Sequence, residues 1–410
     1  MKEQKGKNAG LGPEMARRRV HERNPGPDAR VPSYRRLPLR FTHGEGARLY
    51  DEEGKAYLDF LSGLGVTALG HAHPGLTEAL RDQAGKLLHV SNLYDEPLQA
   101  RCAARLAEAC GLDLVFFSNS GAEANECALK MARRYQHNRG ETGRRAFLAL
   151  ERSFHGRTMG ALSVTANEAY RAPFAPLIPD VQFVPPDDVH ALEGALATEA
   201  FAALILEPIQ GESGVHPLSK SYLETALNLS HGTGTLLVID EIQTGGGRTG
   251  SFLSCQQAGV QPDIVTLAKP LAGGVPIGAT VARREVGESL QPGDHGSTFG
   301  GNLLACRGAL FFLEELFDRG LLVRVRKAGE RFEKGLRDLA KKHKTIRDVR
   351  GQGLMLAIDL DQPSAPVNER LLQSGLLANS LAETALRFLP PFIVQDEEID
   401  EALDLLDQSL

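Results

Sequence analysis

Three chemically capable segments stand directly after three apolar runs of the chain. Lys269 follows the run DIVTLA, Asp240 follows TLLVI, and the small polar segment 118–123 (SNSGAE) follows LDLVFF. Lysine is rarely buried. Lys269 is therefore either a side chain that reaches solvent along its alkyl stem or a Schiff-base lysine whose pKa is lowered by its surroundings. The position of Lys269 alone leaves both interpretations open.

The other two segments are also ambiguous when each is taken singly. A carboxylate such as Asp240 at the end of a buried strand can be tuned by desolvation and by its partners, but it can equally bind Mg²⁺ or cap a helix. The segment 118–123 can be an ordinary helix N-cap. It can also hold a phosphate through free N–H groups and the positive end of the helix dipole.

The three segments together are more specific than any one of them. Pyridoxal phosphate needs N–H donors for its phosphate, an anion beside its pyridinium nitrogen and an amine for its aldehyde. The segment 118–123, Asp240 and Lys269 supply these three groups in that order along the chain. The pattern therefore favours a pyridoxal-phosphate site.

The elements that must position these residues alternate between apolar strands and helices. Strands are predicted at 112–119, 145–150, 201–209, 235–242, 263–269 and 277–283, and helices at 75–88, 97–110, 122–135 and 221–232. Continuous apolar and β-branched runs are typical of a mostly parallel sheet covered by helices on both faces, an α/β architecture. Such sheets bind ligands at the carboxyl ends of their strands, which is where the three segments are expected.

The two ends of the chain show different patterns. Residues 1–30 are polar, and residues 41–61 predict two short strands joined by a turn. After residue 302 a long helical stretch precedes a strand at 353–360 and helices near 366–374 and 396–408. We therefore expect an N-terminal tail (1–30), a large cofactor domain (71–310) and a smaller α+β domain built from 31–70 and 311–410.

Composition and charge argue against several classes of protein. The 410 residues include 46 Lys and Arg against 52 Asp and Glu, a net charge of −6, whereas a general nucleic-acid binder usually carries a basic excess. No apolar run approaches the roughly 20 residues of a membrane-spanning helix, and the N-terminus lacks the apolar core of a secretory signal. The five cysteines form no Cys-x-x-Cys pair, so we expect free thiols in a reducing cytoplasm and no metal site.

Seven motifs resemble those of the class III pyridoxal-phosphate-dependent aminotransferases, which include acetylornithine, ornithine and 4-aminobutyrate aminotransferases. The motifs are NSGAEANECALKMAR (119–133), SFHGRT (153–158), LEPIQGESG (206–214), VIDEIQTGGGRTG (238–250), LAKPLAGGVPIGA (267–279), HGSTFGGN (295–302) and VRGQGL (349–354). The resemblance extends from about Val31 to the C-terminus. It implies the type I fold of pyridoxal-phosphate-dependent transferases, a mostly parallel central sheet flanked by helices with a smaller α+β domain.

The resemblance also implies a role for each matching position around the cofactor ring. Lys269 would form the Schiff base with the cofactor and then move a proton during the reaction. Asp240 would pair with the pyridinium nitrogen, Gln243 would face the phenolic oxygen, and Phe154 would stack on the ring face.

The phosphate would be held mainly by backbone groups. Gly121 and Ala122 match the positions whose N–H groups bind it, and Ser120 and Glu207 belong to the same set of cofactor contacts. Thr298 would reach the phosphate from a second subunit. The resemblance therefore implies a homodimer with shared active sites.

Substrate carboxylates call for cations, and the fork of arginine suits them best. The resemblance places Arg157 and Arg387 at the positions that bind substrate carboxylates in the family. It also places Tyr34 beside the substrate carboxylate and Ser297 among the substrate contacts. Glu212 would pair with Arg387 while an ω-amino donor occupies the site. Release of this pair would free Arg387 for the α-carboxylate of glutamate.

Other positions bear on the substrate. The segments 65–71 (GVTALGH) and 89–94 (HVSNLY) look like those of the acetylornithine subgroup. Leu64 stands where ornithine aminotransferases carry a tyrosine, and an aliphatic side chain suits an acylated amino acid better. Four positions depart from the common family pattern without removing a catalytic group, and they bear on acyl specificity: Ser213, Gly246, Pro270 and Leu303.

The predicted reaction is a ping-pong transfer of the ω-amino group of N²-acetylornithine to 2-oxoglutarate, which gives a semialdehyde and glutamate for arginine biosynthesis. Open alternatives are ornithine, 4-aminobutyrate, succinylated diaminopimelate, or a lysine-pathway amine on an acidic carrier protein that docks on arginines in the segment 17–23. An aminomutase or racemase would share the cofactor apparatus. A binding protein without cofactor could keep the fold.

Overall fold

The computed structural model describes residues 29–410. The chain divides into two units, Met1–Arg40 and Phe41–Leu410. Residues 29–40 contain no helix or strand and are mostly exposed. The predicted tail 1–30, apart from its last two residues, and the arginines in the segment 17–23 lie outside the described residues.

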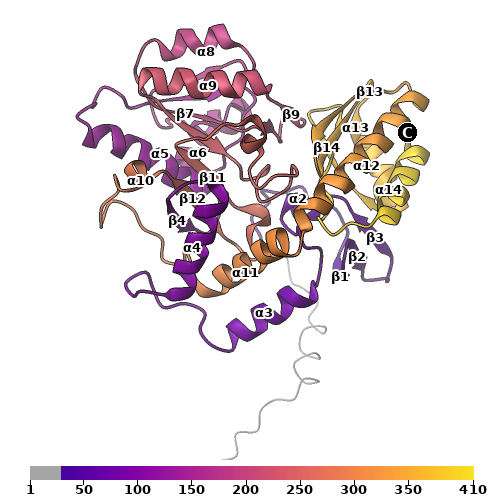
Figure 1. The fold of residues 1–410 in the computed structure, drawn as a ribbon. Coiled ribbons are helices and arrows are strands. Elements are labelled where there is room, and N and C mark those ends of the chain that lie inside the picture. Colours follow the sequence, from indigo (N-terminus) through magenta and orange to yellow (C-terminus); the bar gives the residue numbers. More distant parts are fainter. Residues whose placement is uncertain (1–28) are drawn as a thin grey trace, which may run out of the picture. The chain divides into compact units, whose positions relative to one another are not determined.

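A seven-stranded sheet forms the centre of the large unit (Figure 1). Its order is β4 (Leu114–Ser118), β12 (Gly278–Ala282), β11 (Ile264–Leu267), β10 (Leu236–Asp240), β7 (Phe201–Leu206), β5 (Ala146–Leu150) and β6 (Val181–Val184). The strands from β11 to β6 pair in parallel, and β12 runs antiparallel to both of its neighbours. The predicted mostly parallel α/β sheet is confirmed.

Both faces of this sheet are covered, and β7 shows why its sequence is apolar throughout. All six residues of β7 are buried. Leu204 and Leu206 join one hydrophobic core, whereas Ala203 and Ile205 join the other, as the two-residue period of a strand requires. The helices α8 (Val189–Leu196) and α9 (Lys220–Thr233) contribute to the first core and α5 (Gly121–Asn138) to the second.

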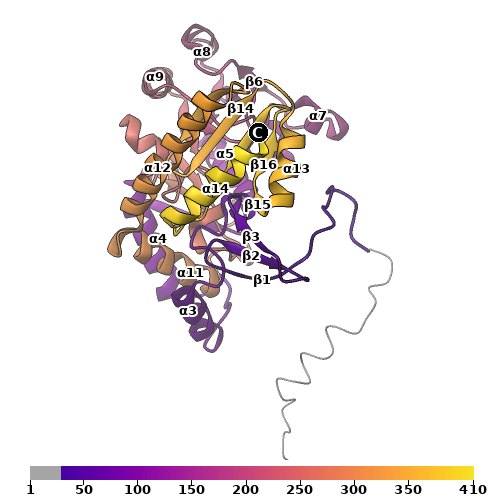
Figure 2. The same ribbon diagram turned by 90° about the vertical axis from the view of Figure 1, so that its right-hand side faces the viewer.

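The ends of the large unit meet in smaller sheets (Figure 2). One has the order β1 (Phe41–Glu45), β2 (Arg48–Asp51), β3 (Ala56–Asp59) and β15 (Leu376–Leu377), and the other β13 (Ile346–Gln352), β14 (Met355–Leu360), β17 (Ala385–Phe388) and β16 (Asn379–Leu381). The parallel pair of β3 and β15 joins residues more than 300 positions apart in sequence. The division into domains near residues 70 and 310 stays a prediction.

Helices surround these sheets. The helices α12 (Leu321–Lys342), α13 (Ser364–Ser374) and α14 (Asp396–Ser409) pack together beside the smaller sheets. The helix α11 (Leu303–Leu313) packs on α3 (Pro74–Ala84), on α4 (Pro97–Cys110) and on the short 3-10 turn η3 (Lys269–Ala272). Through this last contact α11 supports the segment that begins with Lys269.

The remaining elements are short. They are α2 (Ser62–Gly65), α6 (Met159–Ser163), α7 (Glu168–Arg171), α10 (Arg284–Gly287), β8 (Ile209–Gln210), β9 (His216–Pro217), the 3-10 turns η1 (Ala172–Phe174) and η2 (Ser254–Ala258), and the π turn η4 (Glu314–Asp318). All five cysteines are buried and free. Among residues 29–410 no helix is long and apolar enough to cross a membrane.

Candidate active site

A cavity of about 270 Å³ lies at the carboxyl ends of the central strands. Its walls include Lys269, Asp240, Gln243 and Glu207 after or near the ends of β11, β10 and β7, and Gly121 and Ala122 at the start of α5. Phe154, Arg157 and Glu212 complete the predicted residues found there. The structure thus brings nine predicted site residues to one cavity.

Asp240 is the last residue of β10 and lies in a buried hydrogen-bond network. Its Oδ2 atom accepts from Asn125 Nδ2 at 2.8 Å and lies 2.7 Å from His155 Nδ1. Asn125 also donates to the His155 carbonyl and accepts from Thr266 Oγ1 at 2.8 Å. These contacts fix the carboxylate at the cavity wall, which suits a group that must keep its charge beside a cationic ring.

Lys269 occupies an unusual backbone position. The strand β11 ends at Leu267, two residues before the predicted end, because Ala268 and Lys269 leave the strand conformation and Lys269 has a φ of 28°. Such a φ is strained for a residue with a side chain and persists only where the surroundings enforce it. Burial lowers the pKa of the Lys269 amine, although the charge of Glu212 opposes this shift. A lowered pKa increases the neutral fraction that can act as nucleophile and base.

The start of α5 fits an anion. Ser120 is the N-cap, and its Oγ accepts from Glu123 N at 3.2 Å. The first N–H groups of a helix have no partner within it, so those of Gly121 and Ala122 have no helix partner beside the cavity that both residues line. A side chain at position 121 would place its Cβ 2.7 Å from Ile242 Cδ1, which explains the glycine.

Glu207 is a buried carboxylate of the cavity wall. Its Oε1 accepts from Phe154 N at 2.9 Å and its Oε2 from Gly211 N at 3.4 Å. Burial raises the pKa of Glu207 to about 7. Through these two bonds Glu207 ties the Phe154 segment to the loop that carries Glu212.

Arg387 lies at the end of β17 and is fully buried. Its Nη1 donates to Glu212 Oε1 at 2.7 Å and to Gln243 Oε1 at 3.0 Å, and its Nη2 donates to Asn379 Oδ1 at 2.7 Å. Burial alone would raise the pKa of Glu212, but the charges of Arg387 and Lys269 outweigh it and hold that pKa low. Arg387 therefore has a charged partner on one side and a neutral partner on the other.

The other predicted substrate cation is Arg157, an exposed residue at the cavity mouth. Its guanidinium lies 3.6 Å from the centre of the Tyr170 ring and 5.6 Å from that of Phe154. Contact with an aromatic face holds a cation without neutralising it. Arg157 thus remains available to a carboxylate that enters the cavity.

Five predicted site residues are not part of the cavity wall, and one of them is Arg387, which bonds to Glu212 and Gln243 of the wall. Ser120 caps α5 beside it, and Ser297 Oγ accepts from Asn119 Nδ2 at 3.1 Å. Thr298 is exposed. Tyr34 is exposed and belongs to the other unit of the chain, so its predicted contact with substrate stays a prediction.

Three residues that touch Asp240 or Arg387 are not among the predicted site residues: His155, Asn125 and Asn379. His155 stands inside the motif SFHGRT and Asn125 inside NSGAEANECALKMAR, so their motif positions were a signal that could have been used. Asn379 lies outside all seven motifs, and only the pairing of β16 with β17 places it opposite Arg387.

The residues around the cavity fit pyridoxal phosphate. Helix N–H groups, a fixed buried carboxylate and an amine with a lowered pKa lie around one cavity, and they match the phosphate, the ring nitrogen and the aldehyde. When bound, this cofactor supplies an electron sink that makes a proton on the carbon beside the amine acidic.

The fold and the site define a pyridoxal-phosphate-dependent transferase of fold type I. Comparison with known proteins then gives the family. The family model described as Aminotransferase class-III matches residues 31–410. The chain therefore belongs to the class III aminotransferases, which depend on pyridoxal phosphate.

The relatives cover nearly the whole chain. An acetylornithine aminotransferase of Aquifex aeolicus is 46% identical over 92% of this chain and 98% of its own. One from Caldanaerobacter subterraneus subsp. tengcongensis is 45% identical over 92% of this chain and 96% of its own. A solved ornithine aminotransferase of Toxoplasma gondii has a TM-score of 0.90 at 36% identity, over 93% of this chain and 91% of that chain.

Proposed function

We propose that this aminotransferase moves the ω-amino group of N²-acetylornithine to 2-oxoglutarate, giving a semialdehyde and glutamate in arginine biosynthesis. The relatives named acetylornithine aminotransferase carry this proposal, since they are 45–46% identical over more than nine-tenths of the chain. The ornithine aminotransferase structure matches at 36%. The names of the two relatives therefore carry the choice of the acylated substrate.

The residues of the cavity would divide the work of this reaction. Lys269 would hold the cofactor and then carry the proton between the substrate carbon and the cofactor. Asp240, held by Asn125 and His155, would keep the ring nitrogen protonated. Arg157 would bind the α-carboxylate of the acylated donor from the cavity mouth, where its charge is not neutralised.

The pair of Glu212 and Arg387 would let one pocket accept two different amino donors. With the pair closed, the charge of Arg387 is neutralised and the cavity suits the uncharged chain of an ω-amino donor. With Glu212 turned away, Arg387 would bind the α-carboxylate of glutamate or 2-oxoglutarate. The buried position of Arg387 makes this change in charge strong, because interactions are little screened there.

A panel of amino donors tests the substrate. The experiment measures initial rates with 2-oxoglutarate and N²-acetylornithine, ornithine, 4-aminobutyrate or succinylated diaminopimelate. We expect the highest kcat/KM for N²-acetylornithine. Faster turnover of 4-aminobutyrate or ornithine would overturn the substrate assignment and leave the aminotransferase class intact.

Ornithine is the second candidate because the structural match to an ornithine aminotransferase is close. Leu64 bears on the choice. It lies in a segment of left-handed backbone, with a φ of 69°, and is 43% exposed. An exposed aliphatic side chain offers no hydrogen bond to a free α-amine, whereas it can contact an acyl group.

We also propose that two chains form a homodimer through the segments 87–94 and 297–300. Asn92 Nδ2 donates to the carbonyls of Ser297 and Gly300 at 3.1 Å, so the two segments form one surface. This surface exposes five large apolar side chains: Leu87, Leu88, Leu93, Tyr94 and Phe299. Contiguous exposed apolar residues of this size mark interaction surfaces, and this one lies next to Thr298.

Sedimentation of the wild type and of the double variant L93D/F299D tests the dimer. We expect the wild type to sediment as a dimer. The variant should sediment as a monomer and lose activity, because Thr298 of the partner subunit would no longer complete the site. A variant that stays dimeric would contradict this interface. Cytoplasmic location and an acidic carrier protein remain predictions.

A further inference from the structure

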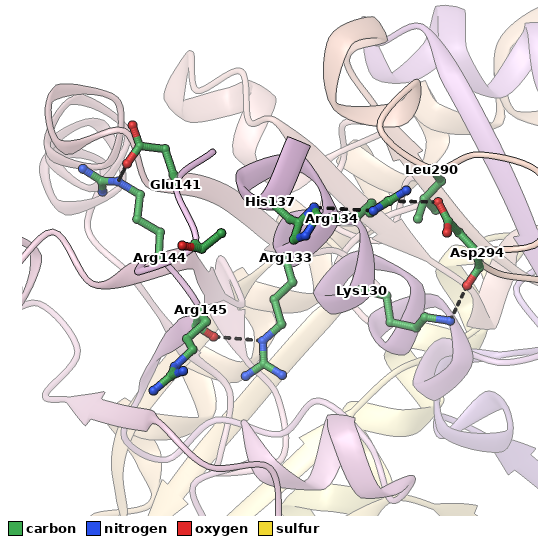
Figure 3. A pocket seen from close by; sticks show the side chains of 10 residues that line it. Lys130, Arg133, Arg134, His137, Glu141, Arg144, Arg145, Leu290 and Asp294 are labelled. Carbon is green, nitrogen blue, oxygen red and sulfur yellow. Dashed lines mark hydrogen bonds and ion pairs between the residues drawn. The ribbon is translucent and has the colours of Figure 1, made fainter. Parts of the chain in front are cut away.

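A second cavity lies beside the C-terminal half of α5 (Figure 3). It has a volume of about 440 Å³, within the range of small-ligand sites. Its α5 residues run from Lys130 to His137, nine or more positions after the start of the helix at Gly121. At 1.5 Å per residue, this is more than about 12 Å along the axis, so the cavity is separate from the active site.

The lining of this cavity is strongly basic. It contains five full cations, Lys130, Arg133, Arg134, Arg144 and Arg145, and also His137. Only two carboxylates line it, those of Glu141 and Asp294. The lining therefore carries three more positive than negative charges, although the whole chain has a net charge of −6.

Another large surface cavity shows that this imbalance is not general. The cavity beside α12 has a volume of about 860 Å³ and contains Arg319, Arg324, Lys327 and Arg331 against three carboxylates. The lining of that cavity thus carries one more positive than negative charge, against three more in the basic cavity.

Several cations of the basic cavity have donors left over. The Arg133 Nε donates to the Arg145 carbonyl at 2.9 Å, and its guanidinium lies 4.5 Å from the centre of the Phe147 ring. Burial lowers the pKa of Arg133, Asp180 opposes this shift and Arg145 adds to it. Arg144 Nη2 donates to Glu199 Oε2 at 2.9 Å, whereas its Nη1 is buried without a hydrogen-bond partner. Such groups gain most from an added anion.

The remaining cations differ in their pairing. Arg134 Nε donates to Asp294 Oδ2 at 3.0 Å. Lys130 Nζ donates to the Asp294 carbonyl at 2.8 Å and lies 2.9 Å from His295 Nδ1. Arg145 pairs with Asp180 at 3.3 Å with both side chains exposed, and such pairs contribute little. Figure 3 shows Arg133 and Arg145 directing their guanidinium groups to the same side of the cavity.

We propose that this cavity binds a small organic phosphate that carries two or more negative charges. A phosphate group offers three acceptor oxygens that arginine forks grip from different sides. The alkyl stems of the arginines and Leu290 offer apolar walls for the organic part. The concave shape favours a small molecule over an acidic protein surface, and the proposal does not depend on the amino donor.

Binding of inorganic tripolyphosphate to the holoenzyme tests the site by titration calorimetry in 0.1 M salt. With cofactor bound, the phosphate cradle of the active site is filled. We expect one tripolyphosphate per chain, with binding at least tenfold weaker in R133Q/R145Q. The variant R145Q alone, at an exposed position, should weaken binding and melt like the wild type. The control variant R105Q/R337Q removes a half-buried and an exposed arginine elsewhere and should bind as the wild type does.

Three results would overturn the proposal. They are no binding of tripolyphosphate, equal binding by the wild type and R133Q/R145Q, and tighter binding of citrate or of a poly-glutamate peptide than of tripolyphosphate. Tighter binding of citrate would indicate that the cavity binds carboxylates rather than phosphates. The peptide would indicate an acidic protein partner.

Discussion

The guanidinium of Arg387 is held between a charged and a neutral acceptor. Glu212 Oε1 lies 2.7 Å from its Nη1, and Asn379 Oδ1 lies 2.7 Å from its Nη2. Glu212 belongs to a loop after β8 and is partly exposed to the cavity, whereas Asn379 lies in β16, paired directly with the strand of Arg387. Movement of Glu212 would therefore leave Arg387 in place and change only its charge balance.

Replacement of Glu212 by glutamine should shift the enzyme towards glutamate. The substitution E212Q keeps the size of the side chain and removes the anion that competes with an α-carboxylate for Arg387. A hydrogen bond to a charged group contributes about 1.5–3 kcal/mol, so kcat/KM for glutamate relative to N²-acetylornithine should rise roughly 10- to 100-fold. Stopped-flow rates of the two half-reactions measure this ratio, and an unchanged ratio would refute the switch.

Asn379 should matter only for the half-reaction that uses Arg387. N379D places a second carboxylate on Arg387, which an incoming α-carboxylate cannot displace. We expect KM for 2-oxoglutarate to rise at least roughly tenfold, with the first half-reaction on N²-acetylornithine nearly unchanged. N379A should raise the same KM less, and equal losses in both half-reactions would indicate a general structural defect instead.

Local elements could be predicted from the sequence because their signals are local. The helix α4 occupies the predicted 97–110, and α5 extends the predicted 122–135 to Gly121–Asn138. The position of the candidate cavity could be predicted from the residues at the strand ends. The contacts of Asp240 could not be predicted, because its partners His155 and Asn125 lie 85 and 115 residues away in the sequence. No local pattern predicts the φ of 28° at Lys269 either, because tertiary packing enforces it.

His155 is expected to act through Asp240. H155A leaves Asp240 with Asn125 and the Ile242 N–H, which lies 3.0 Å from its Oδ1. Loss of one hydrogen bond to a charged group should lower kcat roughly 10- to 100-fold and weaken cofactor binding, with KM for both substrates nearly unchanged. D240N should be much more severe. Steady-state kinetics and cofactor titration of H155A measure these effects. A changed KM for either substrate with an unchanged kcat would contradict this role.

The buried Glu241 gives the fold a pH dependence of its own. Burial raises the pKa of Glu241 from 4.5 to about 7, against the hydrogen bond from Cys255 N at 2.8 Å. The folded chain therefore binds a proton between pH 4.5 and 7 that the unfolded chain has released, and the free energy of unfolding must fall as pH rises through this window. The difference corresponds to about 3 kcal/mol.

Urea unfolding of the holoenzyme between pH 5 and 8 measures this effect. The variant E241Q carries no ionisable proton, so its stability should fall less with rising pH than that of the wild type. Glu207 acts in the same direction, since burial also raises its pKa to about 7. The free energy of unfolding of E241Q should therefore still fall with rising pH, but less steeply than that of the wild type. The variant E78Q changes an exposed glutamate and should follow the wild type. A slope in E241Q equal to that of the wild type would show that Glu241 is ionised in the folded protein over this range.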